Sequence, residues 1–477
     1  MSRYDRYVSP LETRYASPEM QTLFGQQRRV GLWRRLWIAL AEAERELGVA
    51  IPDEALAQMR AAADTVDFER AAEYEARFRH DVMAHVHTYG EAAPAARAWI
   101  HLGATSAYVT DNADLLVLRE ALLLVQARLG AVVRALAAFA HRYRAVPTLA
   151  YTHLQPAQLT TVGKRATLWM QDFAADADEL RYRLVALQFL GCKGTTGTQA
   201  SFLDLFSRDH DKVRRLDRLV AQKMGFDRVV PVSGQTYPRK TDAQILQALA
   251  GIAQSAAKMA ADLRILQHLG EVLEPFGSEQ IGSSAMAYKR NPMRAERITG
   301  LARYVMHLPD NASETAAQQW FERTLDDSAN RRLVLPEAFL ALDAILILAA
   351  DVAARLEVRE NVVRRNVAKE LPFMATERCL MLGVAAGGDR QTLHEVIRRH
   401  SLEVARAVAE EGAPNDLLQR LAADPAFRSA PIAQVARDLD PLHFVGRAPE
   451  QVDEFLHDVV NPLLARLPEA PPAVVRV

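Results

Sequence analysis

Three segments of the chain repeat apolar residues at an alternating spacing of four and three, and this pattern predicts long helices. The segments run from Leu115 to Tyr143, from Leu159 to Leu187 with Asp176 interrupting the repeat, and from Ile245 to Leu266. A sustained period of about 3.5 residues gives each helix one continuous apolar seam, along which neighbouring helices pack nearly antiparallel. Such helices, of roughly 25–35 residues, are about 40–50 Å long.

Small residues flank these seams, so the predicted helices are apolar on more than one side. They include Ala137, Ala138, Ala253, Ala257 and Ala260. Burying all of these faces requires more neighbours than one chain supplies, and we therefore expect an oligomer. A large monomeric bundle is the alternative.

Shorter helices are expected on both sides of the long ones, because the long repeats are confined to the middle of the chain and proline and glycine breaks are frequent after residue 364. No strand-length alternation is evident. We therefore predict an all-α fold of three helical domains, with an N-terminal domain over 1–111, a central long-helix bundle over 112–364 and a C-terminal domain over 365–477. The tail from Pro468 to Pro472 is expected to fray.

Composition narrows the class of protein. The 477 residues are 49% apolar and 25% charged, which is typical of a soluble globular protein. A formal net charge of −1 provides no basic field for nucleic acid. The two cysteines form neither a disulfide framework nor a metal-ligand spacing, which fits a reducing cytosol.

No membrane partner is expected either. The N-terminus has no signal-peptide pattern, and the most apolar run, from Phe339 to Ala350, contains Asp343 and is too short to span a bilayer. The sequence therefore predicts a cytoplasmic protein that binds neither nucleic acid nor membrane.

Residues 275–292 form the segment with the densest chemistry. A proline bounds each end, a helical apolar period is lacking, and adjacent hydroxyls at Ser283 and Ser284 are followed by a lysine and an arginine. Gly282 lets the backbone turn tightly or approach a ligand closely. Polar loops with such content are more often functional than structural.

His153 lies just before Pro156, and a proline there predicts the first turn of a helix. The N-terminus of a helix attracts anions through its free N–H groups and its dipole. A histidine at that place can protonate the leaving group of an anionic ligand. A turn histidine that only caps or packs is the alternative.

Histidines are densest between Arg79 and His87. A metal site would use His85 and His87 together with His80, but the stretch lacks the HExxH spacing and a nearby cysteine pair. Asp81 and His85 are four residues apart and can pair on a helix. An anion-binding or proton-shuttling role for His80 is the sharper hypothesis.

Two further polar stretches are candidate ligand contacts. Residues 191–198 are rich in glycine and threonine but lack the Lys-Ser/Thr end of a phosphate-binding loop, so an interhelical turn and a ligand-facing loop both stay open. Residues 320–332 combine aromatic residues with three arginines. Asp326, Asp327 or Ser328 can cap the following helix. A polyanionic ligand would explain arginines at a helix start, where the dipole disfavours cations.

These stretches resemble the adenylosuccinate lyases, a family of the fumarase/aspartase superfamily, in the branch that includes the animal enzymes. Residues 282–292 are similar to the GSSxMPxKxN loop of the superfamily, and the stretches 79–87 and 319–332 are more specific to the family. Further similar stretches follow in the same order, so that the resemblance covers most of the chain: 14–20, 101–106, 152–165 and 193–202.

The resemblance implies a β-elimination that releases fumarate. Adenylosuccinate would give AMP, and the succinylocarboxamide ribotide SAICAR would give the carboxamide ribotide AICAR. It also implies a homotetramer with the central bundle as its core, sites that take residues from three subunits, and no metal or organic cofactor. Residues 275–292 would supply the catalytic loop.

The resemblance also implies roles for single residues. Ser283 matches the base that removes the succinyl Cβ proton, with Ser284 as its rival, and His153 matches the acid that protonates the departing nitrogen. Lys289 and Asn291 would hold the carboxylate beside the carbanion, where negative charge grows. Lys289, Arg290 and backbone N–H groups of the loop are candidates for activating the serine.

Substrate contacts are carried over by position as well. A phosphate and two carboxylates require several cations, which this set provides despite the low net charge of the chain. The matching residues are Arg14, Tyr15, Arg79, His80, Asp81, Thr105, Ser106, Thr152, Gln235, Asn291, Arg297, Arg323, Ser328 and Arg332.

One position departs from the superfamily pattern. Ala287 stands where the loop normally has proline, which adds a backbone donor, frees φ and predicts a more mobile unliganded loop. A sister lyase acting on argininosuccinate, aspartate or malate is a rival, although it should lack the stretches 79–87 and 319–332. A non-catalytic structural paralogue is another, against which His153, Ser283 and Lys289 argue.

Overall fold

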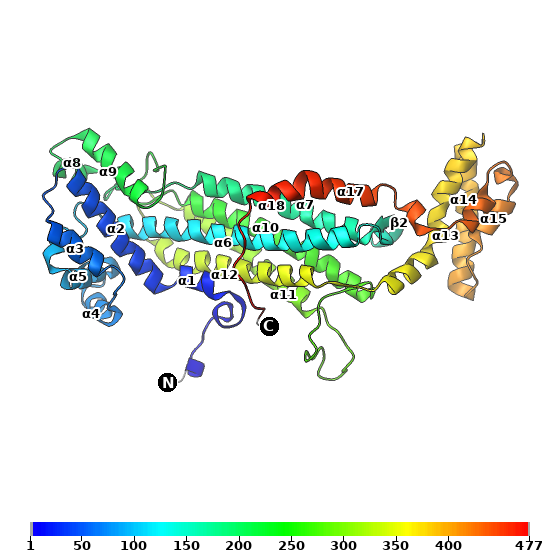
Figure 1. Cartoon of the computed structure of the whole chain (residues 1–477), viewed down its shortest axis with the longest axis horizontal. Coiled ribbons are helices and arrows are strands. Elements are labelled where there is room, and N and C mark those ends of the chain that lie inside the picture. Colours follow the sequence, from blue (N-terminus) through cyan, green and yellow to red (C-terminus); the bar gives the residue numbers. More distant parts are fainter. Residues whose placement is uncertain (1–2, 476–477) are drawn as a thin grey trace.

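Five long helices form the centre of the protein, whose computed structural model describes residues 3–475 (Figure 1). They are α6 (Ser106–Arg142), α7 (Val162–Ala186), α10 (Lys240–His268), α11 (Met293–Ala317) and α12 (Asp326–Ala354). The first and third predicted seams lie on α6 and α10 and are buried, with Tyr143 directly after α6. The second lies on α7 only in part, because Leu159 is in a strand that precedes the helix, Leu187 follows it, and Leu184 is half-buried. The all-α prediction is therefore confirmed.

Further helices gather at the two ends of the bundle (Figure 1). One end carries α2 (Gln26–Glu46), α3 (Asp53–Ala61), α4 (Phe68–Phe78), α5 (Asp81–Ala92), α8 (Ala200–Leu205) and α9 (His210–Lys223), whereas α1 (Pro18–Leu23) lies beside the bundle against α6 and α12. The other carries α13 (Glu360–Ala385), α14 (Arg390–Glu411), α15 (Leu417–Ala423) and α16 (Ile432–Arg437), with an apolar core of their own.

The last helices return to the bundle. Helices α17 (Ala448–Phe455) and α18 (Asn461–Arg466) contact α7 and α6. Short 3₁₀ turns cover Arg3–Asp5, Pro94–Ala96, Pro425–Phe427 and Pro441–Phe444, and π-helical turns cover Leu11–Tyr15 and Leu456–Val460. The division into three domains at residues 111 and 364 stays a prediction.

Two small antiparallel sheets were not predicted. Strands β1 (Pro147–Thr152) and β2 (Gln155–Thr161) form a hairpin between α6 and α7, and β3 (Val272–Leu273) pairs with β4 (Glu357–Val358). Pro156 lies in β2 opposite Tyr151, and α7 begins only at Val162. The prediction of a helix start at Pro156 is therefore wrong, because the chain forms a strand first.

The tail is anchored rather than frayed. Arg134 Nη2 donates to the carbonyl oxygen of Pro468 at 3.2 Å, and Arg128 Nη1 donates to that of Pro471. Arg128 is itself buried. Figure 1 shows the tail crossing the bundle, and these arginines explain why the expected fraying is not observed.

Two helices, α6 and α12, are long and apolar enough to cross a membrane by length and composition alone. Helix α12 extends well beyond the run from Phe339 to Ala350, so the argument that this run is too short was wrong. Most of both helices is nevertheless buried inside the protein. Asp343 on α12 is fully buried, where it accepts from Ser17 N at 2.7 Å and from Arg128 Nε at 3.3 Å.

Candidate active site

Histidine and hydroxyl side chains meet at the end of the bundle that carries α5. His80 caps α5, where its Nδ1 accepts from Met83 N at 3.3 Å, and its Nε2 lies 3.2 Å from Ser106 Oγ. Thr105 is the N-cap residue of α6, and Arg79 ends α4 with a φ of 56°. Two helix starts therefore place the imidazole of His80 beside the hydroxyl of Ser106, with Thr105 next to it in the chain.

Arginines from the start of α12 border these groups. Arg332 Nη2 lies 2.8 Å from Asp81 Oδ2. Burial alone would raise the pKa of Asp81, but the hydrogen bond from Arg332 holds it below its ordinary value. Arg323 Nη1 donates to Asp327 at 2.6 Å, and Ser328 lies in the first turn of α12. The predicted contacts Asp81, Arg323, Ser328 and Arg332 thus lie at the same end as His80.

Gln235 joins this group through the backbone. Its N–H donates to the carbonyl oxygen of Glu322 at 2.9 Å, and its Nε2 donates to that of Thr195 at 3.0 Å. Thr195 belongs to the stretch 191–198, in which Lys193 is buried and paired with Asp217 at 2.6 Å. Lys193 therefore has a structural partner, while Thr195 is exposed.

A buried ion-pair network beneath these residues was missed. Arg239 binds Asp111 and Asp327, and Arg331 binds Asp114 at 3.0 Å and Asp242 at 2.7 Å. A polyanionic ligand is therefore not needed to explain Arg331. Nor does Asp326, Asp327 or Ser328 cap α12, whose N-cap residue Leu325 provides no side-chain bond. The sequence did contain one sign of this network, namely charged residues on one side of otherwise apolar helices.

The hairpin tip carries His153 at the opposite end of the bundle. His153 and Leu154 form the turn with φ values of 54° and 58°, and Thr152 and His153 are exposed. Thr148 of the hairpin lies 3.4 Å from Glu271, just after α10. The interpretation of His153 as a residue at a helix N-terminus is wrong, because a strand follows it.

The loop 275–292 leaves the same end of the bundle as the hairpin. Its base is held by Gln267, which donates to the carbonyl oxygen of Arg290 at 2.7 Å. Arg290 Nη1 is paired with Glu357 at 3.0 Å, and its role in activating the serine stays a prediction. Lys289 is exposed, and Arg297 lies half-buried in the first turns of α11.

Within the loop, Ser283 Oγ accepts from the N–H groups of Ala285 at 3.3 Å and Met286 at 3.1 Å, whereas Ser284 is exposed. Asn291 Nδ2 donates to the carbonyl oxygen of Gly282 at 2.7 Å. A Cβ atom at Gly282 would lie 2.0 Å from the carbonyl oxygen of Lys289, so only glycine permits this closure.

Arg14 and Tyr15 occupy a third place. They end a π-helical turn just before Ser17, whose N–H is bound by Asp343 midway along α12. The candidate residues thus lie at both ends and at the middle of the bundle. Helix α10, whose 29 residues connect the two ends, is about 43 Å long. One copy of the chain therefore cannot place all of them around one small molecule.

Aromatic contacts account for two histidines of the stretch 79–87. His85 lies against Trp33 and Phe68, and His87 against Tyr74 and Phe78. Burial, helped by Arg34, lowers the pKa of His85 to about 4. Among residues 3–475, no group of three His, Cys, Asp or Glu side chains is placed to hold a metal ion.

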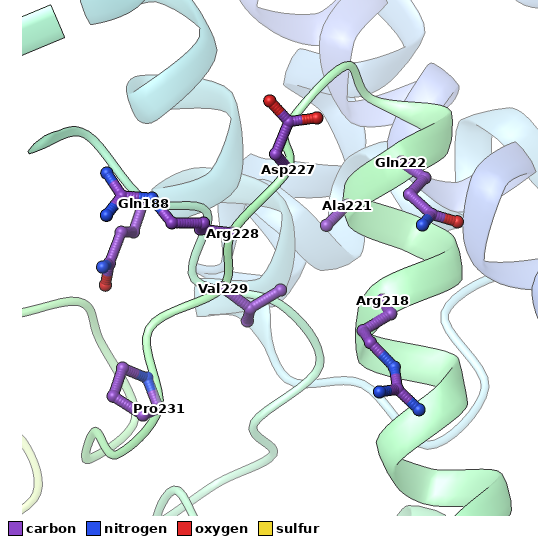
Figure 2. A pocket seen from close by; sticks show the side chains of 8 residues that line it. All are labelled: Gln188, Arg218, Ala221, Gln222, Asp227, Arg228, Val229 and Pro231. Carbon is purple, nitrogen blue, oxygen red and sulfur yellow. The ribbon is translucent and has the colours of Figure 1, made fainter. Parts of the chain in front are cut away.

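A surface cavity of about 390 Å³ beside α9 contains none of the predicted site residues. Arg218 and Arg228 are its cations, and Figure 2 shows their guanidinium groups pointing apart. A second cavity, of about 380 Å³, lies between α2, α6 and α9. Neither cavity is the candidate site.

Comparisons with known proteins point to one family of enzymes. Residues 15–307 match a family described as Lyase, and residues 372–455 match one described as Adenylosuccinate lyase C-terminus. A Schizosaccharomyces pombe protein named adenylosuccinate lyase is 52% identical, covering 98% of this chain and 97% of its own. The adenylosuccinate lyase of Schistosoma mansoni is 47% identical (97% of each chain) and that of Pyrococcus horikoshii 31% (95% and 98%).

Solved structures share the architecture. A fumarate lyase from Mesorhizobium sp. BNC1 has a TM-score of 0.81 at 27% identity, covering 93% of this chain and 99% of its own. A 3-carboxy-cis,cis-muconate lactonizing enzyme from Pseudomonas putida has 0.81 at 25% identity, covering 94% and 99%. Fold and matches together define an enzyme of the lyase class. The chain belongs to the adenylosuccinate lyase family, and the fungal and animal identities confirm the predicted branch.

Proposed function

We propose that the protein cleaves adenylosuccinate to AMP and fumarate and SAICAR to AICAR and fumarate, as a cytoplasmic enzyme of purine biosynthesis. The observation that carries the proposal is 52% identity to an adenylosuccinate lyase over 98% of the chain. The fold alone does not choose the reaction, because it also carries a lactonizing enzyme. The polar groups around His80 and in the loop 275–292 provide the chemistry.

The proposed reaction begins at Ser283. Its Oγ removes the proton from the succinyl Cβ, and His153 protonates the nitrogen as the C–N bond breaks. For this step Ser283 must first lose its hydroxyl proton to solvent; its alkoxide then becomes a hydroxyl as it takes the Cβ proton, and the Cβ–H electron pair forms the double bond of fumarate. The N–H groups of Ala285 and Met286 already point at Ser283 Oγ and would stabilise its anionic form. Ser284, although adjacent, lacks these donors. The exposed Lys289 would neutralise the carboxylate next to the carbanion, and the remaining amide N–H of Asn291 would donate a hydrogen bond to it.

Residues at the other end of the bundle would bind further anionic groups of the substrate. Arg79, His80, Arg323 and Arg332 would bind the phosphate and carboxylates of the substrate, with Asp81, Thr105, Ser106, Gln235 and Ser328 as hydrogen-bonding partners. The site would be completed by residues from other parts of the fold, namely Thr152, Arg14, Tyr15 and Arg297.

We infer a homotetramer with shared sites from the distribution of these residues. His153 and Ser283 lie at one end of the bundle, while His80 and Arg332 lie at the other. Neighbouring copies packed antiparallel along the apolar bundle would bring opposite ends together. The exposed Leu123, Leu168 and Tyr182 on α6 and α7 offer apolar surface for such contacts.

Fumarate release from three substrates tests the proposal. Purified protein is given adenylosuccinate, SAICAR and argininosuccinate in parallel, and fumarate is followed by absorbance. The expected result is turnover of the first two substrates only. Turnover of argininosuccinate alone would assign a sister lyase, and turnover of none by the folded oligomer would favour a structural role.

A further inference from the structure

Arg323 lies in a segment with no regular secondary structure to fix it. Residues 318–325 connect α11 to α12, and within them Phe321 has a φ of 49° and is almost completely exposed. An arginine in such a segment has many rotamers, so its use as an anion contact depends on groups that restrain it.

Close backbone packing provides the first restraint. Gln235 N donates to the carbonyl oxygen of Glu322, and Gly234 lies against the same residue. A Cβ atom at Gly234 would lie 2.4 Å from that carbonyl oxygen, which no side chain tolerates without a backbone shift. The segment is therefore docked on residues 234–235 directly before Arg323.

A buried carboxylate provides the second restraint. Asp327 is almost wholly buried and uses both oxygens: Oδ1 accepts from Arg323 Nη1 at 2.6 Å, and Oδ2 accepts from Arg239 Nε at 2.6 Å. Arg239 in turn binds both oxygens of Asp111, at 2.9 and 3.1 Å. Burial would raise the pKa of Asp327, but the two arginines hold it below its ordinary value.

The remaining N–H groups of Arg323 are left available. Its Nε and Nη2 have no hydrogen-bond partner among the described residues, and its side chain is 24% exposed. The relay Asp111–Arg239–Asp327 joins the starts of α6, α10 and α12, three of the helices that form this end of the bundle. A fixed carboxylate on a rigid helix thus restrains one nitrogen of a flexible arginine and leaves its other donors available.

We propose that Asp327, held by Arg239, is a positioning residue that orients Arg323 for an anionic group of the substrate. The inference deepens the proposed function, on which it rests. It gives the buried residues Asp327 and Arg239 a role in substrate binding, although neither would contact the substrate.

The test is a double-mutant cycle on KM and kcat for adenylosuccinate. Asp327→Asn keeps the shape of the side chain but removes its charge, and Arg323→Gln removes the anion contact. We expect Arg323→Gln to raise KM about ten- to a hundredfold and Asp327→Asn to raise it several-fold, because bonds to charged groups are strong and direction-dependent. In the double variant, Asp327→Asn should add nothing.

Asp242→Asn is the matched control. Asp242 is equally buried and also binds an arginine, but its partner is Arg331, which reaches Asp114 rather than Arg323. Its effect on KM should therefore add to that of Arg323→Gln. Additive effects of Asp327→Asn would overturn the inference, since a merely structural role gives independent losses.

A second variant and a second measurement keep the test decisive. Should Asp327→Asn fail to fold, Arg239→Lys loosens the hold on Asp327 without changing charge, and it too should be non-additive with Arg323→Gln. The same cycle is measured by calorimetric AMP binding. Non-additive AMP binding without turnover would refute the proposed function but support the positioning role, whereas a folded wild type that does neither would overturn both.

Discussion

At the scale of single residues, Glu44 on α2 is unusual because burying its carboxyl group lowers the stability of the fold. It is fully buried, and neither carboxylate oxygen has a hydrogen-bond partner among the described residues. Burial raises its pKa from 4.5 to about 9, so the folded protein keeps this carboxyl protonated at neutral pH. The unfolded chain releases that proton near its ordinary pKa. Because the folded state binds the proton more tightly, stability falls as pH rises between the two values.

Glu44→Gln should remove this pH dependence. Relative to the variant, the free energy of unfolding of the wild type should fall by about 1.4 kcal/mol per pH unit between about pH 5 and about pH 9, a difference on the order of 3 kcal/mol by pH 7. Urea unfolding at fixed protein concentration measures it. The cost of burying the amide in the variant does not depend on pH, so it changes the free energy of unfolding by the same amount at every pH.

Glu75→Gln is the control for Glu44. Glu75 is exposed on α4, so its replacement should leave the pH profile of stability unchanged. A difference between wild type and Glu44→Gln that stays constant over this pH range would show that the buried carboxyl titrates normally.

Residue types in the sequence identified the exposed chemistry better than the buried chemistry. His153, Ser283 and Lys289 were proposed because an imidazole, a hydroxyl and an ammonium in polar stretches match the reaction that the family resemblance implies, and their roles stay predictions. Arg239 and Asp111 were missed because they are separated by more than a hundred residues and meet only in the folded chain. The stretch 320–332 contains both a buried, ion-paired arginine and more exposed ones, and the sequence alone could not tell which was which.

At the scale of elements, helix prediction succeeded where one side of a helix is packed along its length. Residues 341–349 of α12 are all buried, so no periodic pattern marks that helix, and Pro336 lies inside it. The hairpin was not predicted from the sequence for another reason. Its turn residues His153 and Leu154 adopt positive φ without the glycine or asparagine that usually reveals such a turn.

The loop 275–292 contains a turn that explains why proline is usual at the position of Ala287. Lys289 N donates to the carbonyl oxygen of Met286 at 3.0 Å, which places Ala287 at the second position of a four-residue turn. Proline is favoured there because its fixed φ fits the turn. Alanine leaves this part of the loop with more conformations to lose when it closes.

Ala287→Pro should therefore improve catalysis. We expect a two- to fivefold gain in kcat/KM, which corresponds to the roughly 0.4–1 kcal/mol by which a compatible proline stabilises a fold. Steady-state kinetics with adenylosuccinate measures it. Unchanged kcat and KM would show that loop ordering does not limit the reaction.

Ala285→Pro provides the contrast in the same loop. The N–H of Ala285 donates to Ser283 Oγ, so proline removes one of the two donors at the proposed base. This variant should lower kcat about tenfold or more, as the loss of an oxyanion donor does. A benign Ala285→Pro would argue against these donors as activators of Ser283.

At the scale of the whole molecule, the seams predicted a bundle and an oligomer but not where its ends would place the candidate residues. That placement depends on the direction in which each helix runs. The starts of α6, α10 and α12 meet through Asp111, Arg239 and Asp327, whereas the hairpin and the loop base meet β3 at the far end. The proposed reaction needs both ends, and a single chain separates them.

Subunit mixing tests this central claim most directly. Ser283→Ala and Arg332→Ala alter opposite ends of the bundle, and each homo-oligomer should have little activity. If every site takes these residues from different chains, equal mixing with proven subunit exchange should restore about one quarter of wild-type fumarate release from adenylosuccinate. Activity that stays at the level of the separate variants, in oligomers shown by mass spectrometry to contain both chains, would contradict the shared site.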